Sequence, residues 1–256
     1  MARTGDAVAV NRVLVAEKIA DSSLEAHRAA GHEVDVREGL TPDELKEAIV
    51  GASAIIIRSA TQVDAELIAA GSPSLAVVGR AGVGLDNVDT SAATDHGVMV
   101  VNAPESNVTS AAEHTMALLL AQARNVAQAH AALVDGRWER AKWKGVELED
   151  KTLGVVGFGR IGRLVATRAA AFGMKIVAYD PFVSAEAAKR LDIELVELDD
   201  LIATADFLTL HVAKTPDTIN MINAERLAKA KPSLRIVNVA RGGICLLYTS
   251  PSPRDS

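Results

Sequence analysis

The chain has very little cysteine, and this scarcity excludes several classes of protein. Cys245 is the single cysteine among 256 residues, so neither a disulfide framework nor a metal site built from cysteines can form. Such usage is typical of a reducing compartment and favours a cytoplasmic protein. The longest apolar run, residues 116–123, is also far shorter than the roughly 20 residues that a membrane-spanning helix needs. We therefore expect no metal site and no membrane partner.

Aromatic residues and long runs of one charge are scarce as well. The 33 acidic residues outnumber 27 basic ones, giving a formal net charge of -6, and no basic block is present to neutralise the phosphates of a nucleic acid. Only 3% of the residues are aromatic, whereas alanine, valine, leucine and isoleucine dominate the 49% that are hydrophobic. That composition suits β-branched strands alternating with alanine-rich helices, and it favours an α/β fold without a nucleic-acid partner.

The first hundred residues alternate between apolar runs and amphipathic segments. The expected strands lie at 12–16, 33–37, 54–58, 75–80 and 98–101. After the second of them, Thr41 suits a helix N-cap, Pro42 suits the first helical position and Glu44 completes a capping box. Gly51 would end that helix. Uniformly apolar strands separated by helices predict a parallel sheet covered on both faces.

The same alternation begins again in the second half of the chain. A helical periodicity over 110–136 predicts one long helix, and a polar linker over 142–151 follows it. Further strands are expected at 152–157, 175–180, 193–198, 207–212 and 235–240, with helices between them that include 184–190 and 223–230. Two doubly wound parallel-sheet domains of the Rossmann or flavodoxin kind are predicted, over 1–103 and 104–244. A Ser/Pro-rich segment without periodicity follows over 245–256.

A glycine motif at the start of the second series indicates a nucleotide site. Gly157, Gly159 and Gly162 form a G-x-G-x-x-G pattern that follows an apolar strand and opens an alanine-rich helix. The first glycine allows a tight turn, the second lets the backbone approach a pyrophosphate, and the third lets helix and strand pack closely. Asp180, 18 residues after the last glycine, would bind ribose hydroxyls and repel a 2′-phosphate, which favours NAD over NADP.

Four segments together resemble the D-2-hydroxyacid dehydrogenase family. They are GRAGVGLDNVD at 79–89, VVNAPESNVTSAAEHTMALLL at 100–120, GFGRIG at 157–162 and NVARGG at 238–243. The resemblance covers about residues 10–244, and RSAT at 58–61 with GRAG at 79–82 points to the phosphoglycerate branch. It implies an NAD-dependent oxidation of 3-phospho-D-glycerate to 3-phosphohydroxypyruvate, the first step of L-serine biosynthesis. It also implies a substrate-binding first domain and an NAD-binding second domain.

The resemblance further implies which residues form the site. Arg241 falls on the catalytic arginine, which holds the carboxylate and the keto oxygen of the substrate. Arg58, Arg80 and Gly82 fall on positions that bind the anionic substrate, and the planar fork of arginine suits both a carboxylate and a phosphate. Arg58 and Arg80 also each end an apolar strand, where ligands lie on open parallel sheets. The implied cofactor-binding residues are Val83, Gly157, Gly159, Arg160, Ile161, Gly162, Asp180, Val212, Val239 and Ala240.

The family's proton-transferring histidine and its partner glutamate come after the NVARGG segment. The residues that follow Ile244 do not resemble the family, and Pro251 and Pro253 oppose a helix there. We therefore expect 245–256 to be a non-native tail, the second domain to be incomplete, and the chain to be an inactive, aggregation-prone fragment. His114 and His211 are interpreted as packing residues.

Several alternatives stay open at this point. Within the family, the substrate could be that of a glyoxylate or hydroxypyruvate reductase, a D-lactate dehydrogenase or a formate dehydrogenase. A different class is also open, because NADH-sensing corepressors of this architecture bind peptide motifs and transfer no hydride to a small acid. The family further implies a homo-oligomer, a dimer or a tetramer, formed through the long helix.

Overall fold

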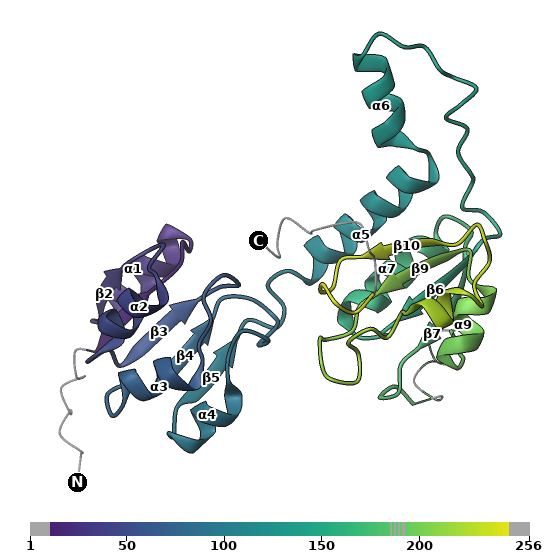
Figure 1. Ribbon diagram of the computed structural model, residues 1–256. Helices are drawn as coiled ribbons and strands as arrows, with labels where there is room; N and C mark the ends of the chain where they lie inside the picture. Colours follow the sequence, from purple (N-terminus) through teal and green to yellow (C-terminus); the bar gives the residue numbers. More distant parts are fainter. Residues whose placement is uncertain (1–10, 185, 187, 189, 191–192, 246–256) are drawn as a thin grey trace. The chain divides into compact units, whose positions relative to one another are not determined.

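The computed structural model describes residues 11–184, 186, 188, 190 and 193–245. The chain divides between Asn107 and Val108 into two compact units, called unit 1 and unit 2 below. Each unit contains one five-stranded sheet in which all paired strands run parallel (Figure 1). The predicted α/β class, with two doubly wound parallel sheets, is confirmed.

Unit 1 reverses its strand order next to its first strand. Its strands are β1 (Arg12–Val15), β2 (Glu33–Val36), β3 (Ala54–Ile57), β4 (Val77–Arg80) and β5 (Met99–Asn102). Its helices are α1 (Asp21–Ala29), α2 (Pro42–Ile49), α3 (Ala65–Gly71) and α4 (Thr90–Asp95). The order across the sheet is β2-β1-β3-β4-β5, so β2 and β3 lie on opposite sides of β1. The loops that follow β1 and β3 therefore diverge, at the position where ligands bind to open parallel sheets.

Core packing and helix capping both fix the elements of unit 1. Leu14, Ile55 and Val78 are fully buried on the side of the sheet that α2, α3 and α4 cover. The predicted start of α2 is confirmed, because Glu44 N donates to Thr41 Oγ1 at 3.4 Å and Thr41 N donates to Glu44 Oε2 at 2.8 Å. A cap of this kind contributes roughly 1 kcal/mol to stability.

Unit 2 also reverses its strand order beside its first strand. Its strands are β6 (Thr152–Val156), β7 (Lys175–Tyr179), β8 (Glu194–Leu195), β9 (Phe207–Leu210) and β10 (Arg235–Asn238). Its helices are α5 (Val108–Ala123), α6 (Val126–Val134), α7 (Arg160–Ala170), α9 (Leu198–Thr204) and α10 (Ala224–Leu227). The order across the sheet is β10-β9-β6-β7-β8, and the reversal lies between β6 and β9. Read from the β8 edge, this is the strand order of a dinucleotide-binding fold.

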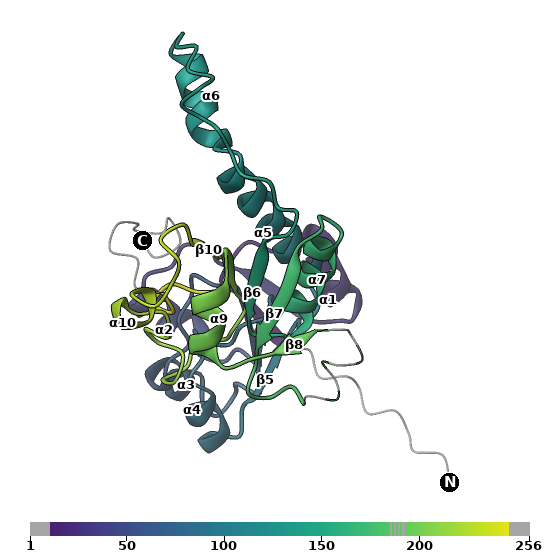
Figure 2. The ribbon, with the colours of Figure 1, turned by 90° about the vertical axis from the view of Figure 1, so that its right-hand side faces the viewer.

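Helices cover both faces of the unit 2 sheet. On β6, Leu153 and Val155 pack among residues of α5 and α7, whereas Val156 packs among residues of α9, which lies on the near face of the sheet in Figure 2. Gly154 leaves room for α9, because a Cβ there would overlap with Leu201. This strand is therefore apolar on both sides, as expected at the centre of a parallel sheet.

The prediction of a single long helix over 110–136 is wrong. Two helices, α5 and α6, replace it, and they are separated at Arg124 and Asn125. Asn125 adopts a left-handed backbone conformation with φ of 54°, and its Nδ2 donates to the carbonyl of Lys144 at 2.9 Å. Asparagine tolerates this conformation better than most residues. α6 projects away from the sheet of unit 2 (Figures 1 and 2).

Two further expectations fall partly outside the described residues. The helix expected over 184–190 includes residues 185, 187 and 189, and the segment 245–256 is described only at Cys245. Of the helices that are described, none combines the length and the apolar character needed to cross a membrane.

Candidate functional site

The predicted glycine motif forms a tight turn between β6 and α7. Gly157 has φ of 90°, a conformation that favours glycine, and its N–H donates to the carbonyl of Tyr179 at 2.9 Å. A Cβ at Gly157 would come within 2.7 Å of the carbonyl carbon and oxygen of His211. A Cβ at Gly162 would overlap with the carbonyl oxygen of Gly157. These two glycines are therefore required by the fold of the turn itself.

The middle glycine of the motif has a different environment. Apart from Gly159, its chain neighbours and the first turn of its own helix, no atom of the described residues lies within 4 Å of a Cβ built at Gly159, so the space in front of this residue is open. Gly159 is the N-cap of α7, and no side chain in the described part of the chain caps the helix there. Arg160 and Ile161 begin the helix, at the positive end of its dipole. Open space before the N–H groups of a helix N-terminus is the arrangement that binds a phosphate.

Asp180 lies beside the glycine turn, at the end of β7. Its Oδ2 accepts the N–H of Phe158 at 2.7 Å, and its Oδ1 accepts the N–H of Phe182 at 2.9 Å. The first of these bonds joins residues 22 positions apart and ties the acid directly to the turn. Each carboxylate oxygen keeps further lone-pair capacity, with which it can accept a hydroxyl group. The glycines and the acid of the sequence motif are therefore brought together.

The end of β9 packs against the same turn. His211 N donates to the carbonyl of Val156 at 2.7 Å, and its ring Nε2 pairs with the buried hydroxyl of Thr209 at 2.9 Å. Burial lowers the pKa of His211 to about 4, so the ring is neutral near pH 7. Val212 Cγ1 lies 2.9 Å from a Cβ built at Gly157. This environment agrees with the interpretation of His211 as a packing residue.

Arg241, the implied catalytic arginine, lies in a turn after β10. The side-chain amide of Asn238 closes this turn, because its Nδ2 donates to the carbonyl of Arg241 at 2.9 Å and its Oδ1 accepts the N–H of Ala240 at 3.0 Å. Arg241 Nη1 donates to the carbonyl of Ala240 at 2.9 Å. Val239 packs against the core on the side of α5 and α7. Local hydrogen bonds and core packing together fix the backbone that carries Arg241.

The chain continues from this turn into the core of unit 2. Ile222 N donates to the carbonyl of Ile244 at 3.1 Å, and Ile222 also pairs with Cys245 in an isolated parallel bridge. Ile244 is fully buried and Cys245 is 7% exposed, and burial raises the pKa of the Cys245 thiol. The packed part of unit 2 therefore extends at least through Cys245.

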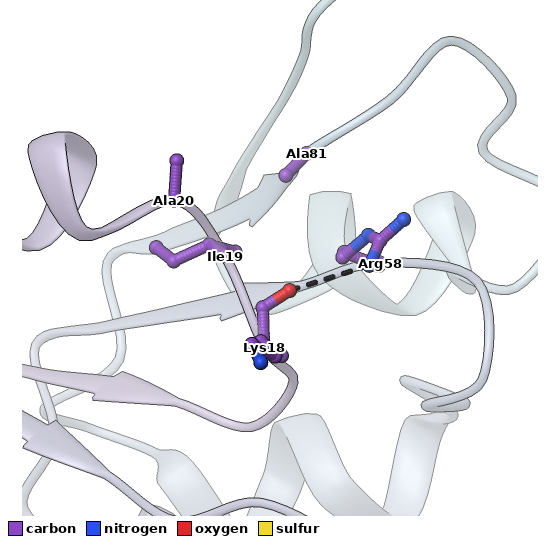
Figure 3. A pocket seen from close by; sticks show the side chains of 5 residues that line it. All are labelled: Lys18, Ile19, Ala20, Arg58 and Ala81. Carbon is purple, nitrogen blue, oxygen red and sulfur yellow. Dashed lines mark hydrogen bonds between the residues drawn. The ribbon is translucent and has the colours of Figure 1, made fainter.

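Unit 1 has a pocket of about 430 Å³ at the carboxyl ends of β1, β3 and β4 (Figure 3). It is lined by Lys18, Ile19, Ala20, Arg58 and Ala81. Arg58 Nη1 donates to the carbonyl of Lys18 at 3.3 Å, which joins the loop after β3 to the loop after β1. The pocket thus lies at the reversal point of this sheet and has a guanidinium in its wall, which suits an anionic ligand.

The second arginine that the resemblance assigns to the substrate, Arg80, ends β4 and lies against Gly82. A Cβ built at Gly82 would overlap with the Arg80 guanidinium, so the glycine provides the room that this side chain occupies. Gly82 N donates to the carbonyl of Arg80 at 2.8 Å. The carbonyl of Val83 accepts the side-chain amide of Asn102 at 2.7 Å. A backbone turn and an asparagine at the end of β5 therefore fix the segment 80–83.

Four residues that hydrogen-bond to the loops carrying Arg58, Arg80 and Arg241 were not predicted from the sequence: Glu17, Asn87, Asn102 and Asn238. Glu17 accepts backbone N–H groups of the loop 58–61, and Asn87 donates to carbonyls of the same loop. The available signal is that Glu17 and Asn102 each directly follow an expected strand, at 12–16 and 98–101. Asn238 lies inside the strand expected at 235–240 and ends the shorter β10 that is observed. The partners of Glu17 are 41 to 44 residues away, so no local pattern identifies them.

Each unit has its candidate site where its own strand order reverses. The site of unit 1 lies after β1 and β3 and offers the guanidinium of Arg58. The site of unit 2 lies after β6 and β9 and offers backbone N–H groups and a carboxylate. Over the ranges 11–184 and 193–245, no group of histidine, cysteine, aspartate and glutamate side chains is arranged to hold a metal ion. The chemistry available is that of a nucleotide and of a small anion.

The sequence is similar to those of known dehydrogenases. Residues 116–246 match the family described as D-isomer specific 2-hydroxyacid dehydrogenase, NAD binding domain. The chain is 54% identical over 234 residues to a D-3-phosphoglycerate dehydrogenase from Mycobacterium tuberculosis, a match that covers 91% of this chain and 44% of that protein. The chain therefore spans less than half the length of this relative.

Solved structures share the fold. The TT0316 protein from Thermus thermophilus is 36% identical with a TM-score of 0.84, over 91% of this chain and 75% of that one. A formate dehydrogenase from Staphylococcus aureus, in complex with NAD, is 30% identical with a TM-score of 0.79, over 92% of this chain and 75% of that one. Residues 116–246 match an NAD-binding domain, so the expected cofactor, NAD, is confirmed. The chain belongs to the D-isomer-specific 2-hydroxyacid dehydrogenase family.

Proposed function

We propose that the protein to which this chain belongs oxidises 3-phospho-D-glycerate to 3-phosphohydroxypyruvate with NAD, the entry step of serine biosynthesis. The observation that carries the proposal is the presence of two arginines, Arg58 and Arg80, at the carboxyl edge of the unit 1 sheet. A substrate with a carboxylate and a phosphate needs several cations, and this chain has a net charge of -6. The similarity to a relative named D-3-phosphoglycerate dehydrogenase supports the same substrate.

In this proposal, unit 2 binds NAD through the glycine turn. Gly159 leaves space for the pyrophosphate, and the N–H groups of Arg160 and Ile161 at the start of α7 stabilise its charge. Asp180 accepts the hydroxyl groups of the adenosine ribose. When bound, NAD supplies the acceptor for the hydride from C2 of the substrate. The remaining proposed cofactor contacts are Val83, Gly157, Gly162, Val212, Val239 and Ala240.

Arginine side chains bind the substrate in this proposal. Arg241 holds the carboxylate through two parallel hydrogen bonds and polarises the C2 oxygen. Arg58 and Arg80 bind the remaining anionic group, and Gly82 gives Arg80 the room that it needs. The proton of the C2 hydroxyl passes to the histidine that the family carries after the NVARGG segment.

Ligand binding tests the proposed substrate. With the NAD-saturated chain, we expect calorimetry to give a Kd for 3-phosphoglycerate at least about tenfold lower than for D-lactate, glyoxylate or formate, because only the first offers a phosphate to the arginines. Arg58→Met should remove that preference and leave the affinity for NAD unchanged. Equal affinities for all four acids would contradict the proposal. Binding of NAD and a peptide motif, without any of these acids, would favour the corepressor class.

We also propose that the protein is a homo-oligomer, a dimer or a tetramer. On α6, Val126, Leu133 and Val134 are 53%, 58% and 71% exposed, and Trp138 beyond the helix is 80% exposed. Covering such apolar side chains stabilises an assembly by roughly 25 cal/mol for each Å² removed from water. Light scattering should give at least twice the mass of one chain, and Leu133→Glu should reduce it to that of a monomer. A monomeric wild-type chain would contradict this proposal.

A further inference from the structure

A half-buried carboxylate holds the loop that carries Arg58. Glu17 stands just after β1, and its Oε1 accepts the N–H of Arg58 at 2.7 Å and the N–H of Thr61 at 2.9 Å. Its Oε2 accepts the N–H of Ala60 at 3.2 Å. The carboxylate of Glu17 therefore accepts three hydrogen bonds from backbone N–H groups of the loop 58–61. These bonds take the place of hydrogen bonds to water.

The opposite side of the same loop is held by an asparagine. Asn87 is only 5% exposed, and its Nδ2 donates to the carbonyl of Arg58 at 2.8 Å and to the carbonyl of Thr61 at 2.6 Å. Glu17 thus binds the N–H groups of the loop, and Asn87 binds its carbonyls. Side chains from two other segments determine the backbone conformation of this loop.

The ionised form of Glu17 is the one that these contacts stabilise. Burial alone would oppose ionisation, but hydrogen bonds from Thr61, Arg58 and Ala60 outweigh it and lower the pKa of Glu17 below its ordinary value. Its negative charge is offset by N–H dipoles, although the carboxylate lies close to a candidate anion pocket. The neighbouring residue, Lys18, accepts Arg58 Nη1 through its carbonyl. The segment 17–18 therefore fixes both the backbone and the side chain of Arg58.

We propose that Glu17 is a positioning residue for the anion pocket of unit 1. It holds the loop 58–61 in the conformation that presents the Arg58 guanidinium to the pocket, and it acts through Arg58 without touching the ligand. This inference rests on the proposed role of Arg58 in binding the substrate. It adds a residue from the loop after β1 to a site otherwise described by the arginines after β3 and β4.

Glu17→Gln tests the proposal with little change in size. The amide keeps one acceptor oxygen but turns an NH₂ group towards a backbone N–H, so at least one of the three hydrogen bonds is lost. Glu44→Gln is the matched control, because Glu44 Oε2 also accepts a backbone N–H, that of Thr41 at 2.8 Å, in the same unit but at the start of α2. Both variants lose a carboxylate that binds backbone, but only one of them holds the loop of Arg58.

Two measurements on the full chain make the test. Amide hydrogen exchange followed by NMR should show faster exchange of Arg58, Ala60 and Thr61 in Glu17→Gln and not in Glu44→Gln. The Kd for 3-phosphoglycerate should rise about tenfold in Glu17→Gln, with the Kd for NAD unchanged. In an Arg58→Met background, Glu17→Gln should have no further effect on the Kd for 3-phosphoglycerate, because Glu17 acts through that arginine.

Each other outcome overturns one specific claim. Unchanged exchange in the loop overturns the positioning role, and so does an undiminished effect of Glu17→Gln in the Arg58→Met background. If the wild-type chain does not bind 3-phosphoglycerate although the loop responds to Glu17→Gln, the proposed substrate is wrong. Inorganic phosphate then serves as the probe. A weaker affinity for phosphate in Glu17→Gln supports the positioning role, and an unchanged affinity overturns it.

Discussion

The two units place a candidate anion site at the reversal point of a parallel sheet, but they build it from different groups. In unit 1 the charge comes from the side chains of Arg58 and Arg80, on loops held by other side chains. In unit 2 the donors belong to the backbone, at the turn Gly157–Gly162 and the start of α7. A site made of backbone depends on the absence of side chains, whereas a site made of arginines depends on where those side chains are held.

The largest expected effect of a substitution is on the folding of unit 2. In Gly162→Ala the new Cβ would overlap with the carbonyl oxygen of Gly157, which is backbone and cannot rotate away. We expect the free energy of unfolding in urea to fall by about 3 kcal/mol. Gly159→Ala is the matched control and should lower it by no more than about 1 kcal/mol, the cost of alanine at a helix N-cap, since no other residue crowds its Cβ. Equal losses in the two variants would contradict this distinction.

Acidification should destabilise unit 2 through its partly buried histidine, His211. Burial lowers the pKa of His211 from 6.5 to about 4. As the pH falls, the imidazole of His211 gains a proton in the unfolded chain before it does so in the folded one. The contribution of the neutral ring to the free energy of unfolding is therefore complete above pH 6.5 and is lost as the pH falls towards 4. Between about pH 7 and pH 4.5, the wild-type chain should lose about 2 kcal/mol more unfolding free energy than His211→Gln.

The control for this titration is a histidine that is not buried. His114, interpreted from the sequence as a packing residue, is exposed on α5, and His114→Gln controls for the loss of an imidazole from unit 2. If His114→Gln and His211→Gln change the dependence equally, burial of His211 is not its cause. Urea denaturation at a series of pH values provides the measurement.

The control substitution of the glycine turn also separates binding from folding. Gly159→Ala should leave the fold intact but place a methyl group where the pyrophosphate approaches the backbone. We expect the Kd for NAD to rise about tenfold, equivalent to about 1.4 kcal/mol. Calorimetric titration with NAD measures it, and an unchanged Kd would show that the open space before α7 is not used.

The smallest expected effect is in unit 1. The Cβ of Gly82→Ala would displace the Arg80 guanidinium, a flexible group that can move at little cost to the fold. We expect the Kd for 3-phosphoglycerate to rise roughly fivefold, or about 1 kcal/mol, with the free energy of unfolding unchanged. A loss of stability without a change in this Kd would mean that Gly82 has a structural role only.

The sequence predicted those parts of the molecule whose causes are local. The capping box of Thr41 and Glu44 and the order of strands and helices follow from neighbouring residues. The glycine turn with Asp180 follows from a motif whose spacing reflects the geometry of the site. The break at Asn125 was not predicted, because the apolar periodicity continues through it and the contact with Lys144 joins residues 19 positions apart.

The residues that hold the loops of the candidate sites could not be predicted from the sequence either. Glu17 and Asn87 are ordinary polar residues in the sequence. They acquire a role only because β3 lies between β1 and β4 in the sheet, which brings the loops after β1 and β4 to the two sides of the loop after β3. Their partners are 26 to 44 residues away along the chain. The arginines could be placed at strand ends, but the residues that hold them depend on tertiary structure.

The proposed assignment of NAD to unit 2 and of the substrate phosphate to unit 1 is tested most directly by hydrogen exchange with one ligand at a time. Mass spectrometry of the full chain should show that NAD alone slows exchange over 157–162, whereas 3-phosphoglycerate alone slows it over 58–61 and 80–82. That result would assign the nucleotide to the backbone site of unit 2 and the phosphate of the substrate to the arginine site of unit 1. Protection of 58–61 by NAD alone, or no protection of unit 1 by 3-phosphoglycerate, would contradict the account.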